Sequence, residues 1–218
     1  MRTTSASLAL VCVLIASGPT AAEGFFDLYA GGAFTQDDRE TLQLPGFLPR
    51  ARLEFRDSPV FGARMGVWGE GRLPFLGAAI DVSGFRPDGQ DRFGPAELYV
   101  VPASFLLMGR VPLLRSDAFP MGQIQPYAAV GPSLVVSHLE IPYPGSNFKD
   151  LDADLGLDVR GGLSFLLDHR IGVFAEYRLT HFEPDYSDRV LGVRAKVSPE
   201  LTTHFIQTGL RFQFYPYH

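Results

Sequence analysis

The chain has 218 residues, of which 46% are hydrophobic and 20% are charged, and its formal net charge at pH 7 is −5. This length suits one or two domains and is sufficient for a substantial core or a closed sheet. The excess of acidic over basic residues, 24 against 19, argues against a nucleic-acid-binding protein, because such proteins carry a basic face.

The first 22 residues have the pattern of an export signal. Arg2 supplies the positive start, an apolar run follows over residues 8–16, and small residues precede Glu23. The apolar run is too short to cross a membrane as a helix, which needs about 20 residues. We therefore predict a cleaved signal peptide over residues 1–22 and a single domain over residues 23–218.

Cys12, within this signal, is the sole cysteine of the sequence. The exported chain is therefore predicted to contain neither disulfides nor a reactive thiol.

Apolar and polar residues alternate with a period of two throughout the remaining chain, as expected for β-strands with two different faces. Such segments are long enough for tilted strands that cross a bilayer, which need about 9–11 residues. Eight are predicted, over residues 25–35, 59–70, 74–85, 97–109, 124–137, 154–166, 170–182 and 203–215.

The connections between these segments alternate in length. Tight turns are predicted at residues 70–73 and 167–170, with a medium connection at 110–123. Long polar connections are predicted at residues 36–57, 86–95, 138–153 and 183–201. Short turns at one end and four long loops at the other are typical of outer-membrane barrels. The fold class is therefore predicted to be all-β, an eight-stranded antiparallel up-and-down transmembrane barrel.

The two faces of the segments differ in chemistry. One face is apolar, whereas the other is rich in glycine and carries opposite charges in balance. These charges are Asp27, Arg64, Asp81, Asp158, Arg160, Glu176, Arg178 and Arg211. We predict that they pair inside a narrow polar lumen, where the glycines leave room for long arginine side chains.

A lipocalin-type calyx is the soluble alternative with the same number of strands. It places apolar residues inside around a ligand and usually carries disulfides. The glycine-rich charged face and the absence of cysteine after residue 22 favour the membrane barrel.

With these segments the chain resembles the eight-stranded outer-membrane β-barrels of the OmpA and opacity-protein type. The resemblance covers nearly the whole exported chain. Four stretches carry it, at residues 26–32, 61–68, 125–132 and 174–178. It implies location in the outer membrane and an assembly signal in the last strand, consisting of Gln207, Gly209, Phe212 and Phe214.

Two features depart from that family. Four residues, 215–218, follow the final aromatic at which many members end. Pro126 and Pro132 lie within the predicted fifth strand, where each removes a hydrogen-bond donor, so we expect a bulge or an early strand end there.

Some barrels of this size are enzymes that act on lipid A, and one class has a His-x-Ser-Asn motif in a late strand. Here His181 is followed two residues later by Glu183 instead of the serine nucleophile. A histidine without a nucleophile supports no acyl transfer. No catalytic residue, cofactor or metal site is therefore predicted. Tyr99, Tyr127, Tyr177, Trp68 and Phe182 are predicted to be interface anchors or barrel packing.

The sequence therefore predicts a non-enzymatic, monomeric outer-membrane protein with a plugged polar interior and four extracellular loops, in a structural or surface-interaction role. Expected partners are outer-membrane lipid and lipopolysaccharide, the barrel assembly machinery during insertion, and an extracellular partner bound by the loops; nucleic acid is not expected. A lipid A-modifying enzyme and a narrow pore for small solutes are the alternatives.

Overall fold

The computed structural model describes residues 22–37, 54–55, 57–91, 94–143, 146–182, 186–190, 193–197 and 201–214. Residues 1–21 of the expected signal peptide and residues 215–218 lie outside this part. No helix that could cross a membrane occurs among the described residues.

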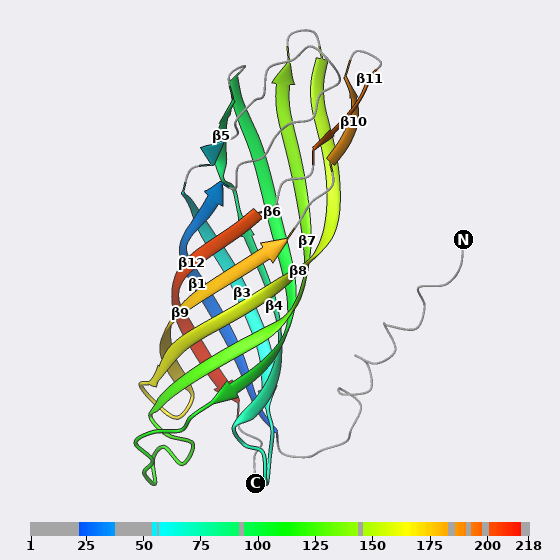
Figure 1. The fold of residues 1–218 in the computed structure, drawn as a ribbon. Helices are drawn as coiled ribbons and strands as arrows, with labels where there is room; N and C mark the ends of the chain where they lie inside the picture. Colours follow the sequence, from blue (N-terminus) through cyan, green and yellow to red (C-terminus); the bar gives the residue numbers. More distant parts are fainter. Residues whose placement is uncertain are drawn as a thin grey trace, which may run out of the picture.

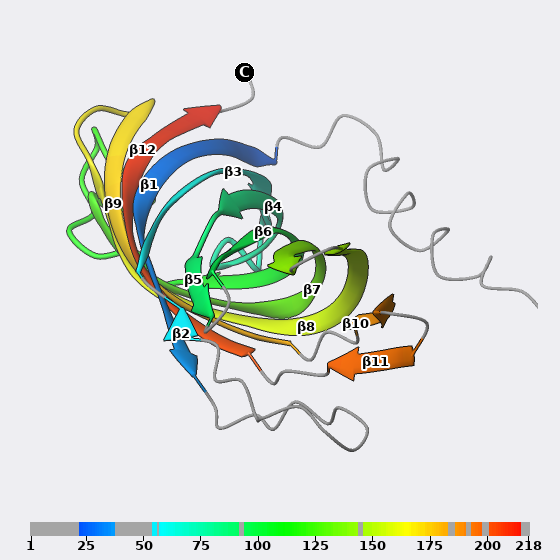
Figure 2. The ribbon, with the colours of Figure 1, turned by 90° about the horizontal axis from the view of Figure 1, so that it is seen from above.

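Eight long strands form the body of the structure. They are β1 (Glu23–Asp37), β3 (Ser58–Trp68), β4 (Leu76–Phe85), β6 (Gly94–Arg110), β7 (Ile124–Tyr143), β8 (Ser146–Leu166), β9 (Ile171–Phe182) and β12 (Leu201–Phe214). Each pairs antiparallel with the next long strand along the chain, and β1 pairs with β12 to close the ring, which Figure 2 shows end-on. The predicted all-β, eight-stranded up-and-down barrel is confirmed.

The two ends of the barrel carry different connections. At one end, hereafter the turn end, β1 begins, β12 ends, and residues 69–75, 111–123 and 167–170 connect the strands. The opposite end, hereafter the loop end, carries the four other connections. Four shorter strands belong to these connections: β2 (Glu54–Phe55), β5 (Asp88–Asp91), β10 (Tyr186–Val190) and β11 (Val193–Val197).

The prediction of a long loop over residues 138–153 is wrong. Strand β7 continues to Tyr143 and β8 begins at Ser146, and the two remain paired up to that point. Figure 1 shows β6, β7 and β8 rising above the rest of the barrel at the loop end. This connection is therefore largely a projecting hairpin, because the strand pairing continues beyond the segments in which apolar and polar residues alternate.

The expected bulge or early strand end at Pro126 and Pro132 is also wrong. Strand β7 runs through both prolines, and its register with β8 is unbroken. On the β6 edge, pairing stops at Ser104↔Ser133 and resumes in the same register at Leu107↔Val130. A proline lacks its N–H toward one neighbouring strand only, so Pro132 opens a short gap on one edge without shifting the strand.

The pleat sorts the side chains as the sequence predicts. In β12, Phe205, Gln207, Arg211 and Gln213 point inward and are buried, whereas Ile206 and its alternate neighbours point outward. The same alternation holds in the other long strands. Large apolar side chains are therefore exposed around the outside of the ring, and the core lies inside it.

Candidate functional site

Among the described residues, ten charged side chains are buried inside the barrel, five arginines and five carboxylates. They are Arg64, Arg110, Arg160, Arg178, Arg211, Glu23, Asp27, Asp81, Asp158 and Glu176. The eight charged residues singled out in the sequence are all among them. A buried charge without a partner destabilises a fold, so each of these side chains needs an oppositely charged partner.

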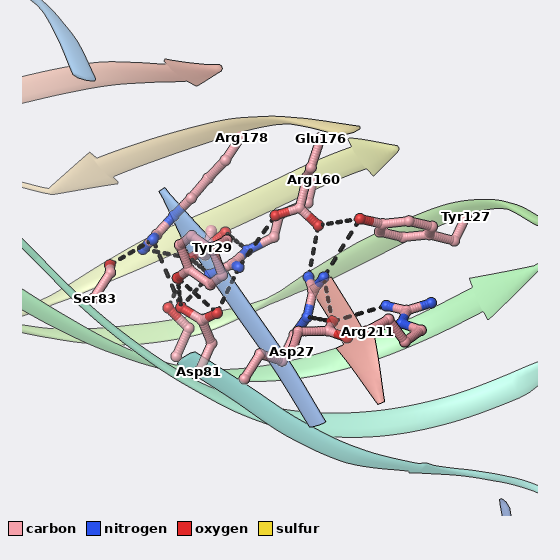
Figure 3. A network of polar contacts seen from close by, with 12 residues as sticks. Asp27, Tyr29, Asp81, Ser83, Tyr127, Arg160, Glu176, Arg178 and Arg211 are labelled. Atoms are coloured by element: carbon pink, nitrogen blue, oxygen red, sulfur yellow. Dashed lines mark hydrogen bonds and ion pairs between the residues drawn. The ribbon is translucent and has the colours of Figure 1, made fainter. Parts of the chain in front are cut away.

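The first group of charges surrounds Arg64 of β3. Its Nη2 lies 2.8 Å from Asp27 Oδ2 on β1, and its Nη1 lies 2.6 Å from Glu176 Oε2 on β9. Arg211 donates from Nε and Nη2 to the two Asp27 oxygens, both at 2.8 Å. Tyr127 donates to Glu176 Oε2 at 2.8 Å. Two arginines thus share one aspartate, and Glu176 reaches Arg64 from across the lumen (Figure 3).

The second group surrounds Arg160 of β8. Its Nη1 and Nη2 donate to both oxygens of Asp81 at 2.8 Å, a bidentate pair across the lumen to β4. Its Nε and Nη2 donate to Asp158 at 2.9 and 2.8 Å. Arg178 Nη2 lies 2.8 Å from Asp158 Oδ2, and the Tyr29 hydroxyl donates to Asp81 at 2.9 Å (Figure 3). Arg160 Nη1 also lies 3.4 Å from a Glu176 oxygen, which joins the two groups into one network.

A third ion pair lies at the turn end. Arg110 donates from Nη1 and Nη2 to the two Glu23 oxygens at 2.7 and 2.6 Å. Gln213 also donates to Glu23 at 3.0 Å, and the Arg110 guanidinium lies 4.3 Å from the Trp68 ring centroid. The sequence prediction missed this pair because its segments began at residue 25 and ended at residue 109, one or two residues inside the observed strands.

The space beside the inward glycines holds aromatic rings, whereas the sequence analysis expected it to hold arginine side chains. Tyr29 lies directly opposite Gly62, and Tyr127 directly opposite Gly162. A Cβ added at Gly62 would lie 2.4 Å from the Tyr29 ring, and one at Gly162 would lie 2.6 Å from the Tyr127 ring. Each glycine therefore lets a ring from the neighbouring strand lie flat over it. Guanidinium groups then lie near the rings, as Arg211 does 4.7 Å from the Phe25 centroid.

The interior is not polar along its whole length. An apolar cluster lies in the half nearer the loop end, where Phe85 and Phe205 meet edge to face with centroids 5.2 Å apart. Its members are Ala33, Val60, Phe85, Leu98, Val100, Val135, Phe182, Leu201 and Phe205. The buried charges described above thus lie in the middle and turn end of the lumen, beside a second apolar cluster that includes Phe25 and Trp68. The half nearer the loop end combines the first cluster with buried Ser137 and Thr203, and Asp154 faces inward there opposite Val135.

The four residues of the expected assembly signal divide between the faces. Gln207 is buried inside, and Gly209 faces inward, where an added Cβ would lie 2.2 Å from the Leu28 carbonyl oxygen. Phe212 and Phe214 point outward near the turn end. The aromatic side chains divide too: Trp68, Tyr127 and Phe182 are buried packing residues, whereas Tyr99 and Tyr177 are exposed on the outside.

His181 points outward near the loop end of β9. Its Nδ1 lies 3.0 Å from the Thr202 hydroxyl on β12. This hydroxyl comes from the neighbouring strand, so inspection of the sequence around His181 did not find it. Within the described part of the chain, no group of three or more potential metal-ligating side chains is found.

No family model and no curated protein matches the chain. Solved structures do. OprG of Pseudomonas aeruginosa, an outer-membrane protein, matches with a TM-score of 0.65 and 14% identity over 91% of this chain and 99% of its own. The chain has the fold of the eight-stranded outer-membrane β-barrels.

Two further structures support this fold. The outer-membrane protein AlkL, whose structure was determined in lipid bilayers, matches with a TM-score of 0.65 and 14% identity over 93% of this chain and 95% of its own. Neisserial surface protein A matches with a TM-score of 0.55 and 12% identity over 88% and 97%.

Proposed function

We propose that the chain is a monomeric, non-enzymatic protein of the outer membrane whose barrel is closed by its own side chains, and that it serves a structural or surface-interaction role through its loops. The observation that carries this proposal is the inversion of the two faces. All ten ionisable side chains described above are buried inside, whereas large apolar groups such as Phe61 and Leu155 are more than half exposed outside. In water this arrangement would expose hydrocarbon around the whole ring, whereas in lipid it is favourable.

The height of the apolar surface supports the same proposal. On β4 every outward residue from Leu76 to Gly84 is apolar, and Arg86 follows the strand. The ten residues of β4 rise by about 25 Å if the strand is tilted by about 40°, which is the height of the apolar band of outer-membrane barrels. The assembly machinery of that membrane is the expected partner during insertion, and the expected signal consists of Gln207, Gly209, Phe212 and Phe214.

The filled interior favours a closed barrel over a pore. An eight-stranded barrel has an interior just wide enough for side chains. Here the Arg64 and Arg160 networks cross it, and two apolar clusters pack nearer its ends. Ions that entered would have to separate paired charges and pass closely packed apolar side chains.

The test combines location with conductance. After expression, the protein should fractionate with the outer membrane, migrate differently on gels before and after heating, and give no discrete conductance steps in planar bilayers. Recovery as a soluble periplasmic protein would contradict the membrane barrel. Regular single-channel steps would contradict the closed interior alone.

One contact favours a second candidate, a lipid A-modifying enzyme. The Thr202 hydroxyl lies 3.0 Å from His181 Nδ1, within reach for a nucleophile and its base. If the chain is such an enzyme, its expression should change the mass of lipid A, and His181→Ala or Thr202→Val should abolish the change. An unchanged lipid A spectrum would leave only the non-enzymatic role.

A further inference from the structure

Three outward side chains form a row across neighbouring strands near the loop end. Tyr99 of β6 lies directly opposite His138 of β7. Arg86 follows Phe85, which pairs with Val100, so the next position along β4 comes level with Tyr99. The Arg86 guanidinium carbon lies 4.8 Å from the centroid of the Tyr99 ring. A cation, a phenol and an imidazole thus lie side by side on the outside of the barrel.

This row marks the loop-end limit of the apolar outer surface on β4, β6 and β7. Phe85 and Val100, beside the row in sequence, are buried inside, whereas Arg86 and Tyr99 are exposed. One step toward the turn end, the outward residues are Gly84, Val101 and Val136, and the surface below them remains apolar down to Leu76.

A guanidinium at this position marks the level of lipid headgroups. Arginine on the lipid face costs about 2–4 kcal/mol at the middle of a bilayer and little near its surface. The contact with Tyr99 fixes the guanidinium plane, and a planar guanidinium donates well to phosphate. A neighbouring imidazole adds another donor when protonated.

We propose that Arg86, Tyr99 and His138 bind the phosphate of the phosphorylated glycolipid of the outer leaflet, with the acyl chains of that lipid lying on the apolar surface below. This proposal rests on the membrane placement proposed above, because a lipid of that leaflet reaches the row only if the loop end faces outward. The glycolipid fits better than a free anion because the row stands directly above hydrocarbon-facing side chains, so a single ligand satisfies both surfaces.

The opposite wall provides an internal comparison. There Tyr177 and His204 hydrogen-bond each other, as do His181 and Thr202. Tyr177 is outward and 48% exposed, close to the 42% of Tyr99. This polar group includes no arginine, so it offers no permanent charge to a phosphate. Tyr177→Phe is therefore the matched control for changes in the row.

The experiment measures lipid retention on the folded full-length barrel. Wild type, Arg86→Gln, His138→Gln and Tyr177→Phe are inserted into nanodiscs of phosphatidylethanolamine with a minor fraction of lipid A, and native mass spectrometry gives the fraction that retains lipid A. Arg86→Gln should lower the apparent affinity about fivefold, and His138→Gln by less, because one basic residue at an anionic surface contributes about this factor. Tyr177→Phe should match wild type.

Further arms identify the ligand and separate this proposal from the membrane placement. Lipid A stripped of its phosphates should be retained poorly by wild type, and Arg86→Lys should keep part of the affinity. Equal retention by wild type, Arg86→Gln and His138→Gln would overturn the proposal, as would equal retention of dephosphorylated lipid A. Displacement of lipid A by inorganic phosphate would show a site for free anions and would overturn the glycolipid assignment. Failure of wild type to insert, judged by heat-modifiable mobility, would instead contradict the proposed membrane function.

Discussion

Arg160 is the side chain on which the interior network depends most, and its replacement gives the sharpest test of that network. It makes four charge-assisted hydrogen bonds to Asp81 and Asp158 at 2.8–2.9 Å, and its side chain has no exposure. Arg160→Met keeps the approximate length of the side chain and removes the charge. The charges of the two carboxylates would then be balanced by Arg178, which lies 2.8 Å from Asp158 and 3.7 Å from Asp81, and the hydroxyls of Tyr29 and Ser104 would still donate to them.

The expected loss is about 3–5 kcal/mol in the free energy of unfolding, the usual cost of breaking a buried pair by removing one partner. It is smaller than four separate charge-assisted bonds would suggest, because Arg178 remains to compensate part of the lost charge. Adding Asp158→Asn restores the charge balance, and the double variant should recover about 1–3 kcal/mol.

The measurement is urea-induced unfolding in phospholipid vesicles, followed by the change in gel mobility on heating. Val159→Ala is the control, since Val159 neighbours Arg160 but points outward, and its replacement should cost only about 0.5 kcal/mol. Equal stabilities for Arg160→Met and Val159→Ala would refute the idea that the charges stabilise the barrel as a network. A double variant no more stable than Arg160→Met would refute the charge-balance argument.

Three further predictions follow from the same geometry. Arg178→Ala should cost up to about 3–5 kcal/mol because it removes one of the two arginines that pair with Asp158, and the loss should shrink when Asp158→Asn is added, as urea unfolding in vesicles will measure. Gly62→Ala should cost about 1–3 kcal/mol because its Cβ would collide with the Tyr29 ring, and the midpoint of the same unfolding curve reports it; no change would contradict the close packing. Phe214→Ala should reduce the amount inserted in cells far more than the yield of folding in detergent, since it changes the expected assembly signal, and equal reductions in both would contradict that role.

The fold could be predicted because the signal for it is repeated in every long strand. Alternation with a period of two identifies the strands, and the position of the charges identifies the inner face. The alternation did not reveal the strands over residues 138–153, and the reason is physical. A hairpin that projects beyond the apolar band need not place hydrocarbon on either face, so its strands do not carry the alternation that reveals a membrane-spanning segment.

The identities of the ion pairs could not be predicted. Glu176 and Arg178 are two residues apart on one face, a spacing that would allow them to pair. Instead Glu176 reaches Arg64 and Arg160, whereas Arg178 reaches Asp158 and Asp81. Partners depend on the tilt and stagger with which the sheet closes, and these quantities are properties of the ring and not of any strand.

The charges therefore do more than fill the lumen: they select one register for the sheet. Arg64 on β3 contacts Glu176 on β9, and Arg160 on β8 contacts Asp81 on β4, so these two ion pairs join strands that are not neighbours in the ring. A slip of one residue in any of these strands would turn its arginine or carboxylate outward, because the period of the pleat is two. In lipid, each arginine so exposed would cost about 2–4 kcal/mol near the middle of the bilayer, and its former partner would be left buried without a counter-charge. With an apolar interior of the same volume, a barrel that closed in a shifted register would expose no charge to lipid and would not suffer this cost. The network thus makes incorrect registers expensive even if replacing it with hydrocarbon would leave the correct one equally stable.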